Sequence, residues 1–126
     1  MNINQIKSNL KMNKFYFCNY SFQRDSMVND GEFDINLTKN IQKIADHTYE
    51  VELVTIIEKE DMKLEIVAKA EFIYEAEDYS REESLIETNT VAIMFPFIRS
   101  QVSLMTSQPG MTPIVLPAIN AKKLIS

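Results

Sequence analysis

Apolar and polar residues alternate along much of the first 75 positions, with the period of two that marks a half-buried β-strand. Polar side chains separate Phe33, Ile35 and Leu37, and Glu50 and Glu52 lie in a second alternating stretch. The pattern predicts four strands at about 15–24, 33–43, 49–57 and 64–75. Polar or charged loops separate them, so the sequence predicts a four-stranded antiparallel sheet within residues 14–78.

The first strand carries aromatic residues on both predicted faces, a pattern that a monomer does not easily bury. Any one of these aromatics is better explained by ordinary core or edge-strand packing. Cys18 is expected to be a small buried hydrophobe. The two predicted faces are Tyr16, Cys18, Tyr20 and Phe22 on one side, and Phe15 and Phe17 on the other.

The period becomes helical in the region 80–107. Ser80 and Glu83 have the spacing of a capping box and predict a short helix. A break at 88–90 is expected to recap into a long helix, which Pro96 should kink. Pro109-Gly110 ends this helix, and an extended tail is expected over 108–126.

The long helix is apolar over roughly twice the ~100° arc that one sheet would cover. Its second apolar stripe therefore predicts a further covering surface, for which a second copy of the chain is the simplest candidate. A core position inside a monomer is the alternative. The expected oligomer interface comprises Tyr16, Tyr20, Phe22, Ile93, Phe97 and Leu104.

The 126 residues predict a single domain, 1–126, in which 1–12 form a helix or a tail. A net charge of −5 argues against nucleic acid and against an anionic membrane surface as partners. No apolar run approaches the ~18 residues of a membrane span, and no secretory signal is evident. The cytoplasm is therefore the expected compartment.

Catalytic chemistry finds little support in this sequence. His47 follows Asp46, but adjacent turn residues seldom face one another, and no nucleophile is evident. The acidic runs 58–61 and 75–78 fit a solvated hairpin and a strand end better than a metal site. One cysteine and one histidine supply no zinc cluster. We expect no catalytic residue, no metal and no cofactor.

Four segments resemble motifs of the SecB family of protein-export chaperones, and they follow one another along the chain in the family's order. The strongest is Met94-Phe95-Pro96-Phe97-Ile98-Arg99, which is similar to the family's Leu-Phe-Pro-Tyr-x-Arg. The others are the segment 114–120, which is similar to the family's leucine-rich segment ending in Pro-x-Asn, the stretch 46–51, which fits Asp-x-x-Tyr-Glu-Val, and Phe15-Tyr16 with Ser21-Phe22. The resemblance covers roughly Phe15 to Leu124.

The resemblance implies an α+β fold in which helices back a four-stranded antiparallel sheet. It also implies a dimer of dimers with the long helices between the sheets, and ATP-independent holding of unfolded chains. From the loop and the tail that would flank the client groove, we expect client contacts at Met27, Val28, Phe33, Met111, Val115 and Ile119.

The sequence departs from the family pattern at three places. Asn19 and Gln23 stand where the family has acidic side chains that engage the motor SecA, so motor binding is in doubt. The crossover at 25–31 is short, and the chain stops near Leu124, before most of the family's second helix.

The function expected from the sequence is ATP-independent binding of unfolded or partly folded polypeptides. The client is either an exported preprotein delivered to SecA or a dedicated toxin-antitoxin or phage-related polypeptide. The amides at 19 and 23 favour the dedicated role. The alternative is a non-catalytic adaptor that binds one folded partner, and a small-ligand or enzymatic domain ranks third.

Overall fold

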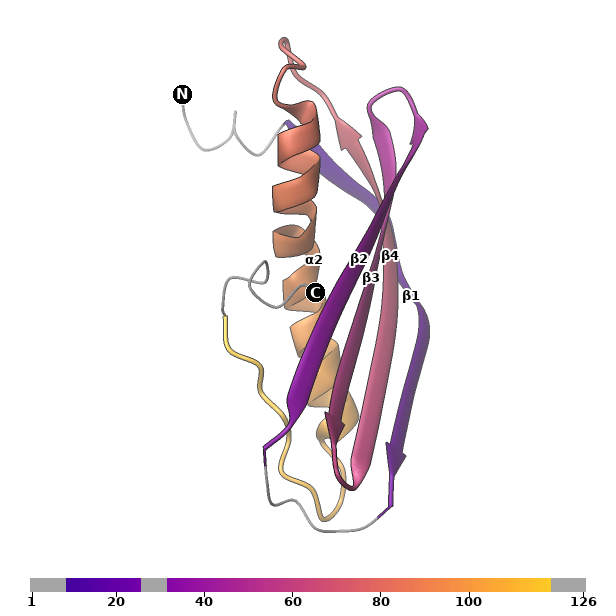
Figure 1. Ribbon diagram of the computed structural model, residues 1–126, viewed down its shortest axis with the longest axis vertical. Helices are drawn as coiled ribbons and strands as arrows, with labels where there is room; N and C mark the ends of the chain where they lie inside the picture. Colours follow the sequence, from indigo (N-terminus) through magenta and orange to yellow (C-terminus); the bar gives the residue numbers. More distant parts are fainter. Residues whose placement is uncertain (1–8, 26–31, 119–126) are drawn as a thin grey trace.

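The computed structural model describes residues 9–25 and 32–118. Its elements are β1 (Leu10–Arg24), β2 (Asp34–Ala45), β3 (Thr48–Lys59), β4 (Met62–Tyr74) and α2 (Glu82–Thr106). The strands form one antiparallel sheet in the order β1-β4-β3-β2, and α2 lies along one face of it (Figure 1). The predicted antiparallel sheet with a long helix packed on it is confirmed.

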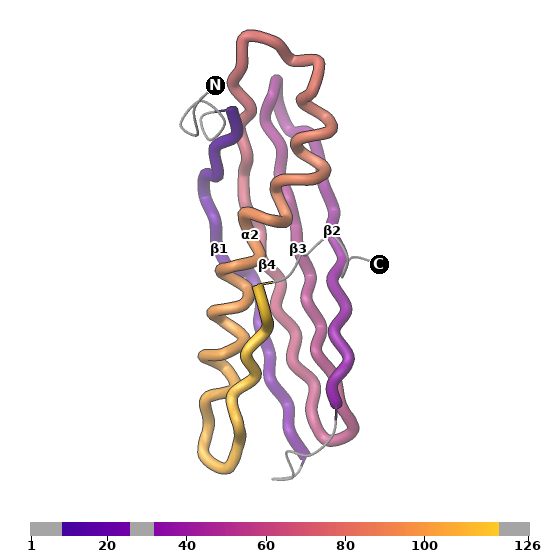
Figure 2. The backbone as a smooth tube through the Cα atoms, turned by 90° about the vertical axis from the view of Figure 1, so that its left-hand side faces the viewer, coloured from indigo at the N-terminus to yellow at the C-terminus, as the bar shows by residue number. Residues whose placement is uncertain are grey.

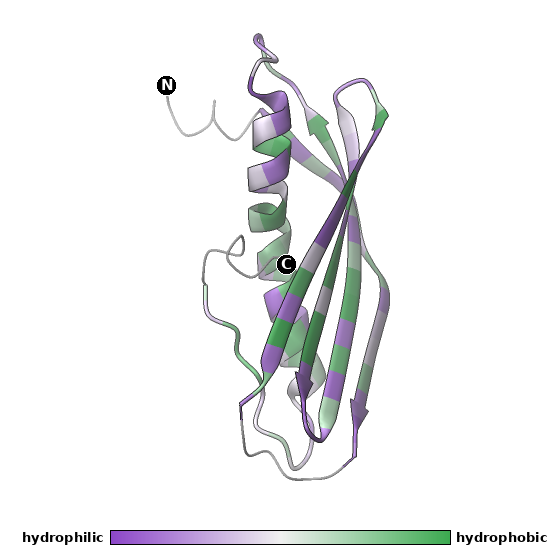
Figure 3. Cartoon of the chain, viewed as in Figure 1, coloured by the Kyte–Doolittle hydropathy of each residue, from purple (hydrophilic) through white to green (hydrophobic). Residues whose placement is uncertain are grey.

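The hydrophobic core lies between α2 and the face of the sheet that the helix covers. On β3 and β4, every second side chain is buried, so apolar and polar bands alternate along these strands (Figure 3). Ile86, Val91, Met94, Ile98 and Val102 supply the helix side of this core. The tail after α2 turns back beside the helix (Figure 2), and its Ile114 and Leu116 are also buried in the core.

The prediction for the first strand needs two corrections. β1 begins at Leu10, so residues 10–12 are strand, while 1–8 lie outside the described residues. Its register against β4 shifts between Asn13 and Tyr16 and again between Phe17 and Asn19. Such irregularities change which face the following residues occupy, so strict alternation fails here. Cys18 is consequently exposed, not buried.

The helical region is one helix and not two. At the expected break, Thr88 and Thr90 donate their hydroxyl hydrogen bonds back to helix carbonyls, those of Ser84 and Ile86. The capping box is also wrong, because Ser80 bonds to Asp78 while Arg81 is the N-cap residue. The helix continues through Pro96, which lies on its exposed side.

Candidate functional site

Three of the expected client contacts come together at one hollow. Phe33 directly precedes β2, and Met111 and Val115 lie in the tail. These three residues line a cavity of about 220 Å³, which we call the client hollow. Phe33 is 38% exposed and Val115 is 76% exposed, so both offer apolar surface to solvent. Met27, Val28 and Ile119 lie outside the described residues.

The tail side of this hollow is fixed by hydrogen bonds to α2. The Ser103 hydroxyl donates to the Ile114 carbonyl (3.0 Å), and the Ile114 N–H donates to Oγ1 of Thr106 (2.8 Å). Burial alternates along the tail, with Ile114 and Leu116 inward and Val115 outward. At the tail's start, Arg24 donates to the Gly110 carbonyl (2.9 Å). The tail side of the hollow is therefore fixed to α2 and exposes the apolar side chain of Val115.

The residues expected at an oligomer interface do not all lie on one side of the sheet. Tyr20 pairs with the buried Ile66 and thus shares the helix-covered face, whereas Tyr16 pairs with Lys69 on the other face. Leu104 is the most exposed member of the set, at 69%. Phe22 and Ile93 are half-buried, and exposed fractions near one half belong to Tyr16, Tyr20 and Phe97.

Part of the second helix stripe is covered from within the chain. The ring of Phe97 lies 4.8 Å from that of Phe15 on β1, centroid to centroid. Phe97 nevertheless remains 46% exposed. Leu104 of α2 and Tyr20 of β1 are likewise exposed apolar side chains on the helix-covered side.

Asn19 and Gln23, the positions in doubt for motor binding, are both exposed on β1. They pair with Val67 and Lys63 of β4, on the face of the sheet that α2 leaves uncovered. The two amides carry no charge themselves, although Glu65 lies between them on the same face, paired with Ser21.

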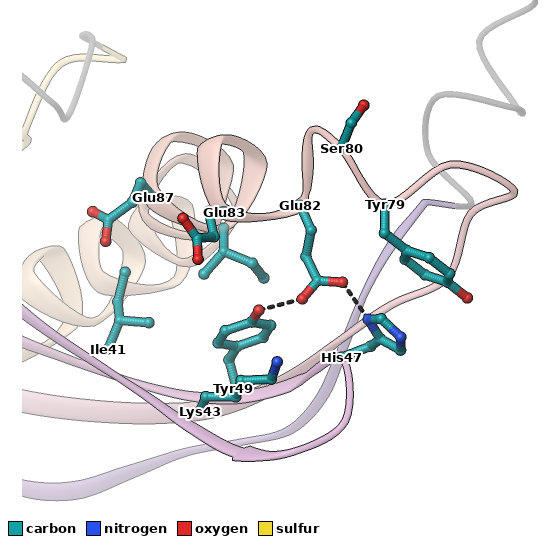
Figure 4. Close-up of a pocket in the computed structure, with 10 residues that line it drawn as sticks. Ile41, Lys43, His47, Tyr49, Tyr79, Ser80, Glu82, Glu83 and Glu87 are labelled. Atoms are coloured by element: carbon teal, nitrogen blue, oxygen red, sulfur yellow. Dashed lines mark hydrogen bonds and ion pairs between the residues drawn. The ribbon is translucent and has the colours of Figure 1, made fainter.

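The structure also shows a polar cluster that the sequence reasoning missed. Glu82, in the first turn of α2, points down between His47 and Tyr49 (Figure 4) and accepts hydrogen bonds from His47 Nδ1 and from the Tyr49 hydroxyl. The ring of Tyr79 stacks on His47 at 3.9 Å. These residues line an open cavity of about 520 Å³ at the end of the sheet opposite the client hollow.

The charges in this cluster shift two pKa values. Burial alone would raise the pKa of Glu82, but hydrogen bonds from Tyr49 and His47, with the charges of His47 and Lys43, outweigh it and lower that pKa. Burial and the negative charge of Glu82 raise the pKa of Tyr49 to about 12. Glu82 is therefore an ionised acceptor in the fold, so His47 donates from a protonated Nδ1.

The described residues offer little for metal or membrane binding. Within 9–25 and 32–118, no group of three or more His, Cys, Asp or Glu side chains could hold a metal ion. In the same ranges, no helix combines the length and the apolar character that a membrane crossing needs.

Comparison with solved structures places the fold among SecB-like proteins. A SecB-like chaperone of Mycobacterium tuberculosis, solved in complex with a ChAD peptide from an antitoxin, matches 92% of this chain and 91% of its own, with a TM-score of 0.72 and 12% identity. A Streptococcus agalactiae protein of unknown function matches 86% of this chain and 96% of its own, with a TM-score of 0.56 and 9% identity.

Sequence comparison adds a curated relative and a family. An uncharacterised protein of Methanocaldococcus jannaschii is 34% identical over 65 residues, which span 52% of this chain and only 41% of that protein. The family model described as preprotein translocase subunit SecB matches residues 4–126. Because that match covers almost the whole chain, the protein belongs to the SecB family.

Proposed function

We propose that the protein is an ATP-independent chaperone that holds unfolded or partly folded polypeptides in the cytoplasm, without catalysis. The observation that carries the proposal is the client hollow, where Phe33, Met111 and Val115 converge beside an anchored tail. Reversible burial of client apolar side chains there would supply the binding free energy. Membership of the SecB family supports a chaperone role.

A dedicated polypeptide client fits this chain better than general delivery to SecA. The SecB-like chaperone of similar fold binds an antitoxin peptide, which supports a polypeptide client of this kind here. Asn19 and Gln23 carry amides where the family has acidic side chains, so these two positions offer no carboxylate to a motor. The client would be a segment of an antitoxin or of a phage-related protein.

We further propose that the working form is a dimer of dimers. The exposed apolar side chains Tyr20, Phe97 and Leu104 lie on the helix-covered side of the molecule, where a second copy would bury them. Tyr16, on the other face, would contribute only to an additional contact.

Suppression of aggregation tests the holding function. A denatured, aggregation-prone protein is diluted into buffer with the wild type or with Val115→Asp, and light scattering is followed. We expect the wild type to suppress scattering stoichiometrically and Val115→Asp to lose most of that effect, since a charge would enter the hollow. Ile44→Asp is the matched control, because Ile44 is a half-exposed apolar residue on another surface.

Two outcomes would count against the proposal. If the wild type does not suppress aggregation, the fold serves as an adaptor for one folded partner instead. If Val115→Asp holds clients as well as Ile44→Asp does, the hollow is not the client site. A pull-down with SecA addresses the choice of client, because a preprotein-delivery role requires measurable SecA binding.

A further inference from the structure

The start of α2 is fastened to the sheet by tertiary contacts and lacks a side-chain cap of its own. Arg81, the N-cap residue, makes no capping hydrogen bond through its side chain. Glu82, the next residue, is 6% exposed and accepts from both Tyr49 and His47. His47 lies in the turn between β2 and β3, and Tyr49 lies at the start of β3. One carboxylate thus joins the helix start to the tip of a hairpin.

The turn of the β2–β3 hairpin also contacts the segment that leads into α2. The ring of Tyr79 stacks on that of His47 with an interplanar angle of 13°. His47 is held in place in turn, because its carbonyl accepts from the N–H of Tyr74 at 2.8 Å. Its φ of 54° is unfavourable for a residue with a Cβ, so these contacts keep the turn in that form.

We propose that Glu82 is a latch: while it is ionised it holds the start of α2 and the segment 75–81 closed against the hairpin, and once it is neutral this end of the molecule opens while the sheet stays folded. An ionised carboxylate accepts two charge-assisted hydrogen bonds, whereas a protonated carboxyl presents a donor to a site that already contains two donors. Local opening needs only the loss of such contacts at one end.

The groups around the carboxylate set how firmly the latch is held. His47 in the turn and Lys43 on β2 favour the ionised form. Glu83, on α2, adds negative charge near Tyr49 and helps to raise the pKa of that tyrosine. Tyr79, in the segment before the helix, lines the same cavity. Glu87 also lines it and forms an ion pair with Lys39 at 2.9 Å. Protons and water reach the latch through this open cavity.

Hydrogen exchange read by mass spectrometry tests the latch. Glu82→Gln mimics the neutral carboxyl, so at pH 7 its amides in 75–85 should exchange about tenfold faster or more, the factor that one charged hydrogen bond supports. Peptides from β3 and β4 should keep wild-type protection. Glu83→Gln is the control, because it removes the same charge from an exposed neighbour and should leave 75–85 protected.

A second series separates a latch from a general stability residue. The excess exchange of Glu82→Gln over wild type should shrink as pH falls, because the wild-type carboxyl then becomes neutral as well. Wild-type protection of 75–85 in Glu82→Gln at pH 7 would refute the latch. So would an equal loss of protection across β3 and β4, or an excess that does not depend on pH. None of these results depends on whether the protein holds clients.

Discussion

Thr55 is the residue at which this fold leaves a polar group unmatched. It lies on β3 between Leu37 and Ile66 and is fully buried. Its hydroxyl is the one buried side-chain oxygen or nitrogen in residues 9–25 and 32–118 that has no hydrogen-bond partner there. A buried hydroxyl without a partner costs free energy, because it has given up its bonds to water.

Thr55→Val should therefore stabilise the protein by about 1 kcal/mol, since valine keeps the shape and removes the hydroxyl. The measurement is the free energy of unfolding from urea titration. Thr90→Val is the control, because Thr90 is equally buried but donates to the Ile86 carbonyl at 2.7 Å. An equal gain in both variants would show that the missing partner is not the cause.

Lys14 gives a second prediction at this scale, because its φ is 55° at the first irregularity of β1. Glycine adopts that conformation without the cost of about 1–2 kcal/mol that a Cβ imposes. Lys14→Gly should leave the free energy of unfolding unchanged or raised, since the Lys14 side chain that pairs with Glu71 is 72% exposed. Lys11→Gly, elsewhere on the same exposed strand, should cost roughly 0.5–1 kcal/mol. Equal losses would contradict this account.

At the scale of elements, the sequence predicted the regular strands well and the irregular one poorly. β3 and β4 alternate along nearly their whole length and β2 does so up to Ile41, so the faces of these strands could be read directly; β2 has one irregularity, between Lys43 and Ala45. β1 changes register twice, and no single residue in it announces a bulge. The sequence did not reveal that the helix continues through 88–90. A threonine hydroxyl can cap a helix or donate to a carbonyl inside one, and composition alone does not distinguish the two.

The candidate site was only partly predictable, for a related reason. Phe33, Met111 and Val115 could be chosen because the family resemblance indicated which loop and tail flank the groove. The bonds from His47 and Tyr49 to Glu82 join residues that are more than 30 positions apart. No local spacing encodes that contact. The signal that could have been used is that His47 and Tyr49 both lie in the segment 46–51, which resembles a family motif.

The acid limb of the stability curve should depend on Glu82. Its pKa is lowered in the fold, so the stability it contributes is present above the ordinary carboxyl pKa and is lost as pH falls through the lower, folded value. Wild type should be more stable than Glu82→Gln at pH 7, and the difference should vanish on acidification. Urea titrations at stepped pH measure it, and a constant difference would contradict the assignment.

The alkaline limb should depend on Tyr49. Its pKa is raised from 10.0 to about 12, so its contribution is complete below pH 10.0 and is lost as pH rises towards 12. Tyr49→Phe lacks this ionisation and should lose less stability than wild type over that interval. Ultraviolet titration of tyrosinate with parallel unfolding curves checks the point. Equal alkaline losses in the two proteins would mean that Tyr49 is not responsible.

At the scale of the whole molecule, Leu104→Asp tests self-association. Leu104 is 69% exposed on α2, so the change should leave the monomer folded. We expect multi-angle light scattering to show a smaller assembly than for wild type, because a buried charge at a copy-to-copy contact is unfavourable. Val115→Asp is equally polar and more exposed, and it should keep the wild-type mass. Unchanged mass for Leu104→Asp would exclude this surface as the interface.

The strand order also sets how the protein must assemble from its own chain. Hairpins join β2 to β3 and β3 to β4, so these pairs are close in sequence. β1 pairs with β4, although β2 and β3 lie between them in the sequence. Local pairs close faster than distant ones, so β1 is expected to dock late. Until it does, β4 presents an unpaired edge from Met62 to Tyr74. Newly made copies at high concentration would then compete for one another's open edges, and the yield of refolding should fall as protein concentration rises.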